Sequence, residues 1–109
     1  GYFADLEDAG ALDPDAVLAI ATDAAAPAYV RRRAALHAVH LANEAIADRG
    51  AVRDALEALA MDSGTPALVR SGALRGLVDV DGARAKVVAA ALSKDGAAMV
   101  RRAAKAVGP

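Results

Sequence analysis

The chain has 109 residues, with 13 basic and 14 acidic side chains and a formal net charge of −1. This length suits one domain with a modest core, and the even charge balance argues against nucleic acid as the partner. The absence of cysteine excludes disulfides and thiolate metal sites. No signal peptide is visible, and charges interrupt every apolar run before it reaches membrane-spanning length, so we expect a cytoplasmic protein that does not enter membranes.

Alanine-rich composition and the positions of caps and breakers predict an all-α protein. Alanine supplies much of the 56% hydrophobic content, and it is the strongest helix former. Asp13, Thr65 and Asp81 are the expected N-caps, while Pro27 begins a long helix that stops at Gly50. The predicted helices cover residues 14–22, 27–48, 51–61, 66–79, 83–93 and 97–107, and a short turn or helix is an option for residues 2–9.

Two short patterns occur three times each, in the same order. The pattern Ala-x-Val-Arg-x-x-Ala occurs at residues 28–34, 67–73 and 98–104. An Ile/Leu-x-x-Asp pattern precedes each copy, at residues 20–23, 59–62 and 92–95. The repeating unit is therefore a helix that ends near an aspartate, a short loop and a helix that begins around Val-Arg. Its period of roughly 30 to 40 residues is typical of helical solenoids.

This combination resembles the HEAT repeat, and in particular the short HEAT-like repeats first associated with phycobilisome lyases, over about residues 13–107. The resemblance implies an α-α superhelix of five or six helices in antiparallel pairs with a right-handed twist. It implies one domain over residues 1–109, with units near 1–22 (partial), 23–62, 63–95 and 96–109 (partial). Three options remain for the ends: capping by residues 1–10 and the last helix, a longer array of which this chain is a piece, or self-association. Tyr2, Phe3 and Leu6 are candidates for an apolar plug at the N-terminal end.

The repeated arginines are predicted to be structural. On a helical wheel Arg31 and Arg70 fall within the apolar arcs of their helices, whereas the position of Arg101 is less clear-cut. A buried charge needs a partner, and the only acids that recur with the arginines are in the loops. We therefore expect a ladder in which inward-facing guanidinium groups meet loop carboxylates of their own or the adjacent repeat, formed by Asp23, Arg31, Asp62, Arg70, Asp95 and Arg101. The alternative is a basic row that binds phosphates.

Two glycines lie inside a predicted helix, where they lower its stability relative to alanine. Gly72 and Gly76 are four residues apart and so share one face of the helix. Their spacing predicts a close approach of a neighbouring helix.

A candidate surface for a protein partner lies on the second helices of the repeats, which usually line the concave side in solenoids of this family. The outward positions combine a small apolar strip with charges at its rim. They include Arg53, Glu57, Met61, Lys86, Val87 and Ala90. The alternative is alanine-rich helix with nothing bound to it.

No constellation in the sequence predicts catalysis, a cofactor or a metal. His37, His40 and Glu44 share a helix face at spacings that suit metal ligation, but they lie among polar residues and are interpreted as a solvated surface. Deoxyhypusine hydroxylase, an enzyme of HEAT-like repeats, uses paired His-Glu dipeptides, and this chain contains none. Arginines 31–33 are balanced by acids elsewhere and have no aromatic stacking platform.

The expected function is therefore that of a non-catalytic scaffold or module for protein–protein interaction. One alternative is a nucleic-acid-binding helical-repeat protein related to the DNA-alkylation-repair glycosylases. Another, from the resemblance to bilin lyases, is a lyase-like or chaperone-like domain that acts on a chromophore-bearing protein.

Overall fold

The computed structural model describes residues 13–108, and within that range the chain forms six α-helices and no strand. The all-α class predicted from the sequence is thereby confirmed. The proposed short helix in residues 2–9 and the Tyr2, Phe3 and Leu6 plug lie outside the described residues. The helices are α2 (Pro14–Thr22), α3 (Ala28–Asn43), α4 (Arg49–Met61), α5 (Ala67–Val80), α6 (Gly82–Leu92) and α7 (Ala98–Val107).

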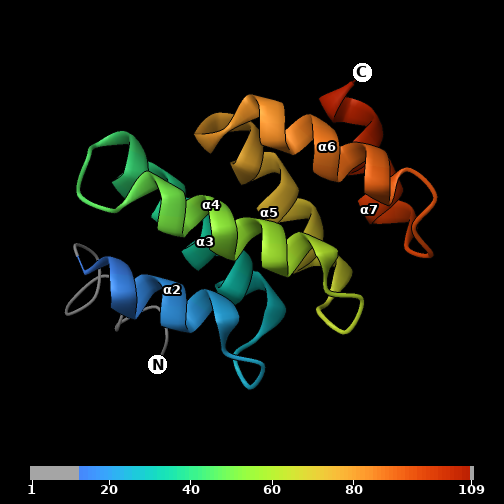
Figure 1. Cartoon of the computed structure of the whole chain (residues 1–109). Helices are drawn as coiled ribbons and strands as arrows, with labels where there is room; N and C mark the ends of the chain where they lie inside the picture. Colours follow the sequence, from blue (N-terminus) through green and yellow to red (C-terminus); the bar gives the residue numbers. More distant parts are fainter. Residues whose placement is uncertain (1–12, 109) are drawn as a thin grey trace.

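The helices form three hairpins stacked side by side. Each hairpin pairs a helix that ends near an aspartate with a helix that begins around Val-Arg: α2 with α3, α4 with α5, and α6 with α7. In Figure 1, α2, α4 and α6 lie in front of α3, α5 and α7, so the stack has two layers. Helix α5 is at the centre and packs against α3, α4, α6 and α7. Its central position explains why it carries more buried residues than any other described helix.

The two layers differ in how closely their helices pack. Helix α3 packs extensively against α5, whereas α4 meets α2 and α6 at only a few points. The two glycines of α5 permit the close contact. A Cβ atom at Gly72 would lie 2.6 Å from Cγ of Arg32, and one at Gly76 would lie 2.9 Å from a methyl carbon of Val39. The predicted close approach at these glycines is therefore confirmed.

Aspartates begin three of the helices by capping free backbone amides. The side chain of Asp13 accepts a hydrogen bond from the amide of Asp15 at 3.1 Å, and that of Asp81 accepts one from the amide of Arg84 at 3.0 Å. Both caps were predicted. The side chain of Asp48 does the same for α4, accepting from the amide of Ala51 at 2.8 Å.

The predicted end of the second helix was wrong by five residues. Helix α3 ends at Asn43, because Ala45 has a left-handed backbone with φ of 60° and the chain turns back on itself. The amides of Ile46 and Ala47 both donate to the carbonyl of Leu41, which is typical of a helix C-terminus. Asp48 and Gly50 therefore belong to the start of the next helix rather than to the end of this one.

The predicted N-cap at Thr65 was also wrong. Pro66 occupies the N-cap position of α5, and no side chain caps that helix. The Thr65 hydroxyl is nearly buried and donates to a carboxylate oxygen of Asp62 at 2.8 Å. Thr65 therefore organises the α4–α5 loop instead of the helix start.

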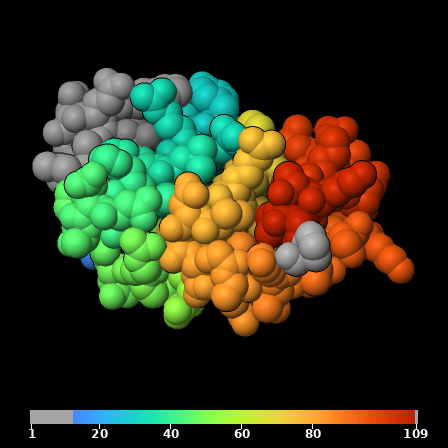
Figure 2. All heavy atoms as spheres, turned by 90° about the horizontal axis from the view of Figure 1, so that it is seen from above, coloured from blue at the N-terminus to red at the C-terminus, as the bar shows by residue number. Residues whose placement is uncertain are grey.

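The core is built from leucine and valine side chains set among many alanines. The largest fully buried side chains include Leu41, Leu56, Leu74 and Leu77. The Cα trace spans 39 × 28 × 16 Å, and Figure 2 shows the colours passing from the N-terminal to the C-terminal helices across the molecule. The α6–α7 hairpin thus forms one end of the stack. Among residues 13–108, no helix has the length and apolarity required to cross a membrane.

Candidate functional site

In the predicted arginine–aspartate ladder, the pair of Arg70 and Asp95 joins the second hairpin to the third. Arg70 is 4% exposed, and its two terminal nitrogens donate to the two carboxylate oxygens of Asp95 at 3.0 and 2.7 Å. Its Nε donates to the carbonyl of Ala60 at the end of α4, at 3.0 Å. This bidentate geometry is one that lysine cannot reproduce. Arg70 therefore ties its own hairpin to the loop of the next one.

The first hairpin repeats part of this arrangement. Arg31 is 5% exposed, and its Nε donates to the carbonyl of Ala21 at 3.0 Å, the same sequence offset as in the second hairpin. The carboxylate of Asp62 accepts hydrogen bonds from the Thr65 hydroxyl and from the amide of Gly64. These bonds, and then the positive charges of Arg70 and Arg31, hold the pKa of Asp62 below its ordinary value. The hydrogen bonds of Asp62 thus come from its own loop, and the positive charges of Arg70 and Arg31 act on it as well.

The third arginine differs from the other two. Arg101 is exposed, in contrast to the expected set of three inward guanidinium groups, and its Nη1 donates to the backbone carbonyl of Asp95 at 2.7 Å. The loop between Asp95 and Arg101 is two residues shorter than the loop between Asp62 and Arg70, which changes the carbonyl within reach. In the remaining loop, the carboxylate of Asp23 accepts from the amide of Ala25 at 2.9 Å.

Acid is expected to destabilise the fold through these loop carboxylates. The hydrogen bonds from Arg70, and then that from the amide of Ala97, lower the pKa of Asp95 from its ordinary value of 3.8, and Asp62 is shifted in the same direction. The unfolded chain therefore binds protons more readily than the folded chain, so this stabilisation is full above the unfolded pKa and is lost as the pH falls through the folded pKa.

Urea unfolding midpoints measured between about pH 7 and about pH 3 would test this dependence. We expect the Asp95→Asn variant to lose less stability between these conditions than the unmodified chain. The exposed control Asp79→Asn should follow the unmodified chain. Equal pH dependence for all three proteins would contradict the assignment.

The candidate partner surface on α4 and α6 is partly occupied by internal ion pairs. Both carboxylate oxygens of Glu57 accept hydrogen bonds from the guanidinium of Arg84, which raises the pKa of Arg84. Arg53 pairs with its neighbour Asp54 at 3.0 Å. Glu57 thus connects α4 to α6, so a charge reversal there would disturb the helix packing as well as any binding.

The other four residues of that candidate surface are solvent-exposed. The apolar members Met61 and Val87 are 48% and 58% exposed, and Lys86 and Ala90 are also exposed. The latter two border the groove described below.

The histidine constellation does not assemble into a metal site. The ring centroids of His37 and His40 are 5.9 Å apart, and Glu44 lies beyond the end of α3. Within the described part of the chain, no three His, Cys, Asp or Glu side chains come together as metal ligands would.

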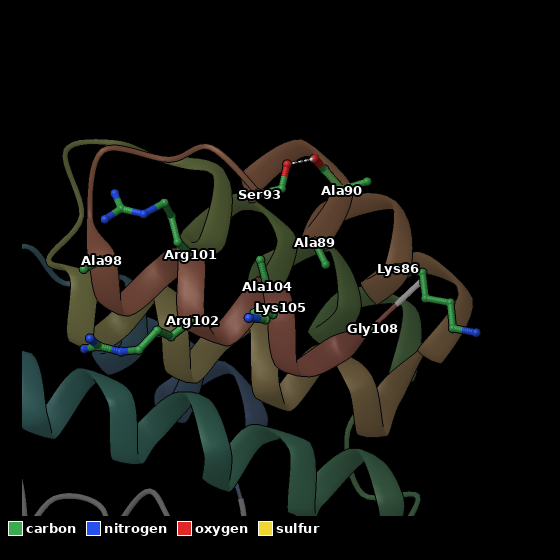
Figure 3. Close-up of a pocket in the computed structure, with 10 residues that line it drawn as sticks. All are labelled: Lys86, Ala89, Ala90, Ser93, Ala98, Arg101, Arg102, Ala104, Lys105 and Gly108. Atoms are coloured by element: carbon green, nitrogen blue, oxygen red, sulfur yellow. Dashed lines mark hydrogen bonds between the residues drawn. The ribbon is translucent and has the colours of Figure 1, made fainter.

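A groove of about 740 Å³ lies between α6 and α7 at the C-terminal end of the stack. Its floor is apolar and built largely from alanine, and Figure 3 shows Ala89 and Ala104 between the two helices. Arg101 and Arg102 project from the first part of α7, and Lys86 projects from α6 on the other side. The groove is lined by Lys86, Ala89, Ala90, Ser93, Ala98, Arg101, Arg102, Ala104, Lys105 and Gly108. All of its charged residues are cations.

This groove was not predicted from the sequence, although the distribution of charge along the chain indicates it. Residues 82–109 contain six basic residues and one acid, Asp95, which is already bound to Arg70. By contrast, residues 1–30 contain six acids and no lysine or arginine. The near-zero net charge of the whole chain conceals this asymmetry.

The geometry defines an all-α protein of three stacked helical hairpins, in which the Arg70–Asp95 ion pair joins the second hairpin to the third and a cationic groove lies open at one end. Comparisons with protein-family models, with curated proteins and with solved structures find no match.

Proposed function

We propose that this chain is a non-catalytic protein-interaction module, a small HEAT-like scaffold acting in the cytoplasm. The groove between α6 and α7 is the observation that carries the proposal. An apolar floor with charges at its rim is the usual composition of a surface that binds another protein. The repeated Val-Arg and Leu-x-x-Asp patterns support the HEAT-like part of the proposal.

The side chains that line the groove suit recognition rather than reaction. They are alanines and cations, together with Ser93, whose hydroxyl donates to the carbonyl of Ala90 at 3.0 Å. Among the lining residues there is no carboxylate or imidazole that would activate this hydroxyl as a nucleophile. The groove therefore offers shape and charge to a partner.

Site-specific photo-crosslinking would test the proposal. A benzoylphenylalanine at Ala98, which lines the groove, is expected to form a discrete protein adduct in an extract of the source organism, identified by mass spectrometry. The same probe at Ala51, an exposed position on α4 outside the groove, is the matched control. Absence of any adduct, or the same adducts from both positions, would contradict a partner-binding groove.

The cationic rim also favours a second candidate, the nucleic-acid-binding helical-repeat protein. Lys86, Arg101, Arg102 and Lys105 would contact phosphates, and such binding weakens steeply with salt. Against it, Tyr29, His37 and His40 are the only residues with aromatic rings among residues 13–108, and none of them lines the groove. Steeply salt-dependent binding to single-stranded or duplex DNA, lost in the Arg102→Glu variant, would favour this candidate over the protein-interaction module.

A further inference from the structure

The groove corresponds to surfaces that the next hairpin covers elsewhere in the stack. Aligning the Val-Arg and Leu-x-x-Asp patterns matches Arg101 to Arg70, Lys105 to Leu74 and Ser93 to Ala60. Arg70, Leu74 and Ala60 are all buried, at 4%, 0% and 0% exposed. Their counterparts are exposed: Ser93 directly follows α6, and Arg101 and Lys105 lie on α7. The groove is therefore a repeat-to-repeat seam that the described residues leave open.

Each of the two covered seams shows one contact that a hairpin supplies when it packs there. It brings a carboxylate to the first arginine of the Val-Arg pattern, as Asp95 does for Arg70. A packing hairpin also places a glycine against the residue that follows this arginine: Gly72 of the second hairpin lies directly against the side chain of Arg32 in the first. The counterpart of Arg32 on α7 is Arg102. A ligand in the groove therefore meets Arg101 and Arg102, which correspond in the repeat to Arg31 and Arg32 of the first hairpin.

We propose that the groove binds an acidic helix of another protein, which packs small residues against α7 and places a carboxylate at Arg101. This inference rests on the proposed function and specifies the partner. Four cations and no acid line the groove, so the complementary ligand is anionic. Arg102 takes the place of Arg32, against which Gly72 packs, so the contact face of the ligand needs alanine or glycine at that point. A solvent-facing surface commonly carries charges of both signs, whereas the charged residues of this groove are all cations.

A second copy of the chain fits the groove less well. Its first hairpin would have to pack α3 against α7, as α5 packs against α3. In α3 the positions of Gly72 and Gly76 are taken by Arg33 and His37. These side chains are bulkier than the glycine that packs against Arg32, so they would crowd its counterpart Arg102. Residues 1–30 carry six acids and no lysine or arginine, so charge alone would also suit a second copy, and the steric mismatch at Arg33 and His37 is what favours a separate acidic partner.

Titration calorimetry with designed peptides would test the proposal on the 109-residue chain. The probe is a helical peptide of roughly 20 residues with alanine and glycine on one face and glutamates on both flanks. A peptide with lysine in place of each glutamate is its control. We expect the acidic peptide to bind and the basic peptide not to bind. Binding of both peptides, or of neither, would overturn the proposal.

Two protein variants locate the binding. Arg102→Glu is expected to weaken the acidic peptide at least about tenfold. Lys94→Glu makes the same charge change on an exposed residue of the same hairpin outside the groove, and it should bind as the unmodified chain does. Matching thermal unfolding of the two variants would show that both fold. Equal weakening by both variants would overturn the assignment to the groove.

Other occupants give distinguishable results. An oligomer in sedimentation equilibrium that Arg102→Glu dissociates would place a second copy in the groove and overturn the proposal. DNA that displaces the acidic peptide would overturn it in favour of a polyanion site. Further residues of the full gene product that cover the groove, seen as protection of Arg102 from phenylglyoxal, would also overturn it. If neither peptide bound but the probe at Ala98 still formed its specific adduct, this inference alone would be wrong. The proposed interaction module would still be supported.

Discussion

Replacing Arg70 with alanine is expected to lower the free energy of unfolding by about 3 kcal/mol, the lower end of the range for breaking a buried ion pair, because Asp95 is only partly buried. Arg70 is almost fully buried, and its guanidinium satisfies both oxygens of Asp95 and the carbonyl of Ala60. Truncation leaves these acceptors without their donor at the junction of two hairpins. Urea unfolding followed by circular dichroism would measure the loss.

Two variants sharpen this prediction. Arg101→Ala changes the equivalent residue of the last hairpin, which is exposed, and it should cost less than about 1 kcal/mol. Arg70→Lys keeps the charge but loses the paired hydrogen bonds, so an intermediate loss is expected. If Arg70→Ala and Arg101→Ala destabilised the protein equally, the Arg70–Asp95 pair would not have the structural role assigned to it.

Gly76→Leu is expected to destabilise the fold by about 3 kcal/mol, because overpacking a tight interface displaces side chains and backbone. A Cβ atom at this position would already lie 2.9 Å from the Val39 methyl and 3.5 Å from Leu56. A leucine there would wedge α3 away from α5, and those helices form the tightest part of the stack. The gain in helix propensity over glycine offsets only about 1 kcal/mol of this loss.

The same substitution at Gly82 is the matched control. A Cβ atom at Gly82 meets nothing within 4 Å, so Gly82→Leu should leave stability within about 0.5 kcal/mol. Val39→Ala combined with Gly76→Leu should recover part of the loss, giving a non-zero coupling energy in a double-mutant cycle. Additive effects, with no coupling between the two positions, would show that the helices do not meet at Gly76 as described.

Features that depend on a single turn or helix were predictable from the sequence. Asp13 and Asp81 cap helices because a short acidic side chain reaches the free amides of the first turn. The helical period placed Arg31 and Arg70 among apolar neighbours, and both are buried. The wrong predictions of this kind concern positions where another local interaction is preferred. Thr65 bonds to Asp62 instead of capping a helix, and the left-handed Ala45 ends α3 early.

Most of the candidate site depends on how hairpins sit against one another. Arg70 binds Asp95, which is 25 positions away, and Glu57 binds Arg84, which is 27 positions away. Helical periodicity carries no information about contacts at that sequence separation. The open groove also needed the tertiary structure, because Arg101 carries the same local pattern as Arg70. The sequence by itself determined where helices form and which faces are apolar, since these follow from short-range sterics and spacing. Only the tertiary structure decided which equivalent faces are covered, because burial requires a neighbouring hairpin to pack there.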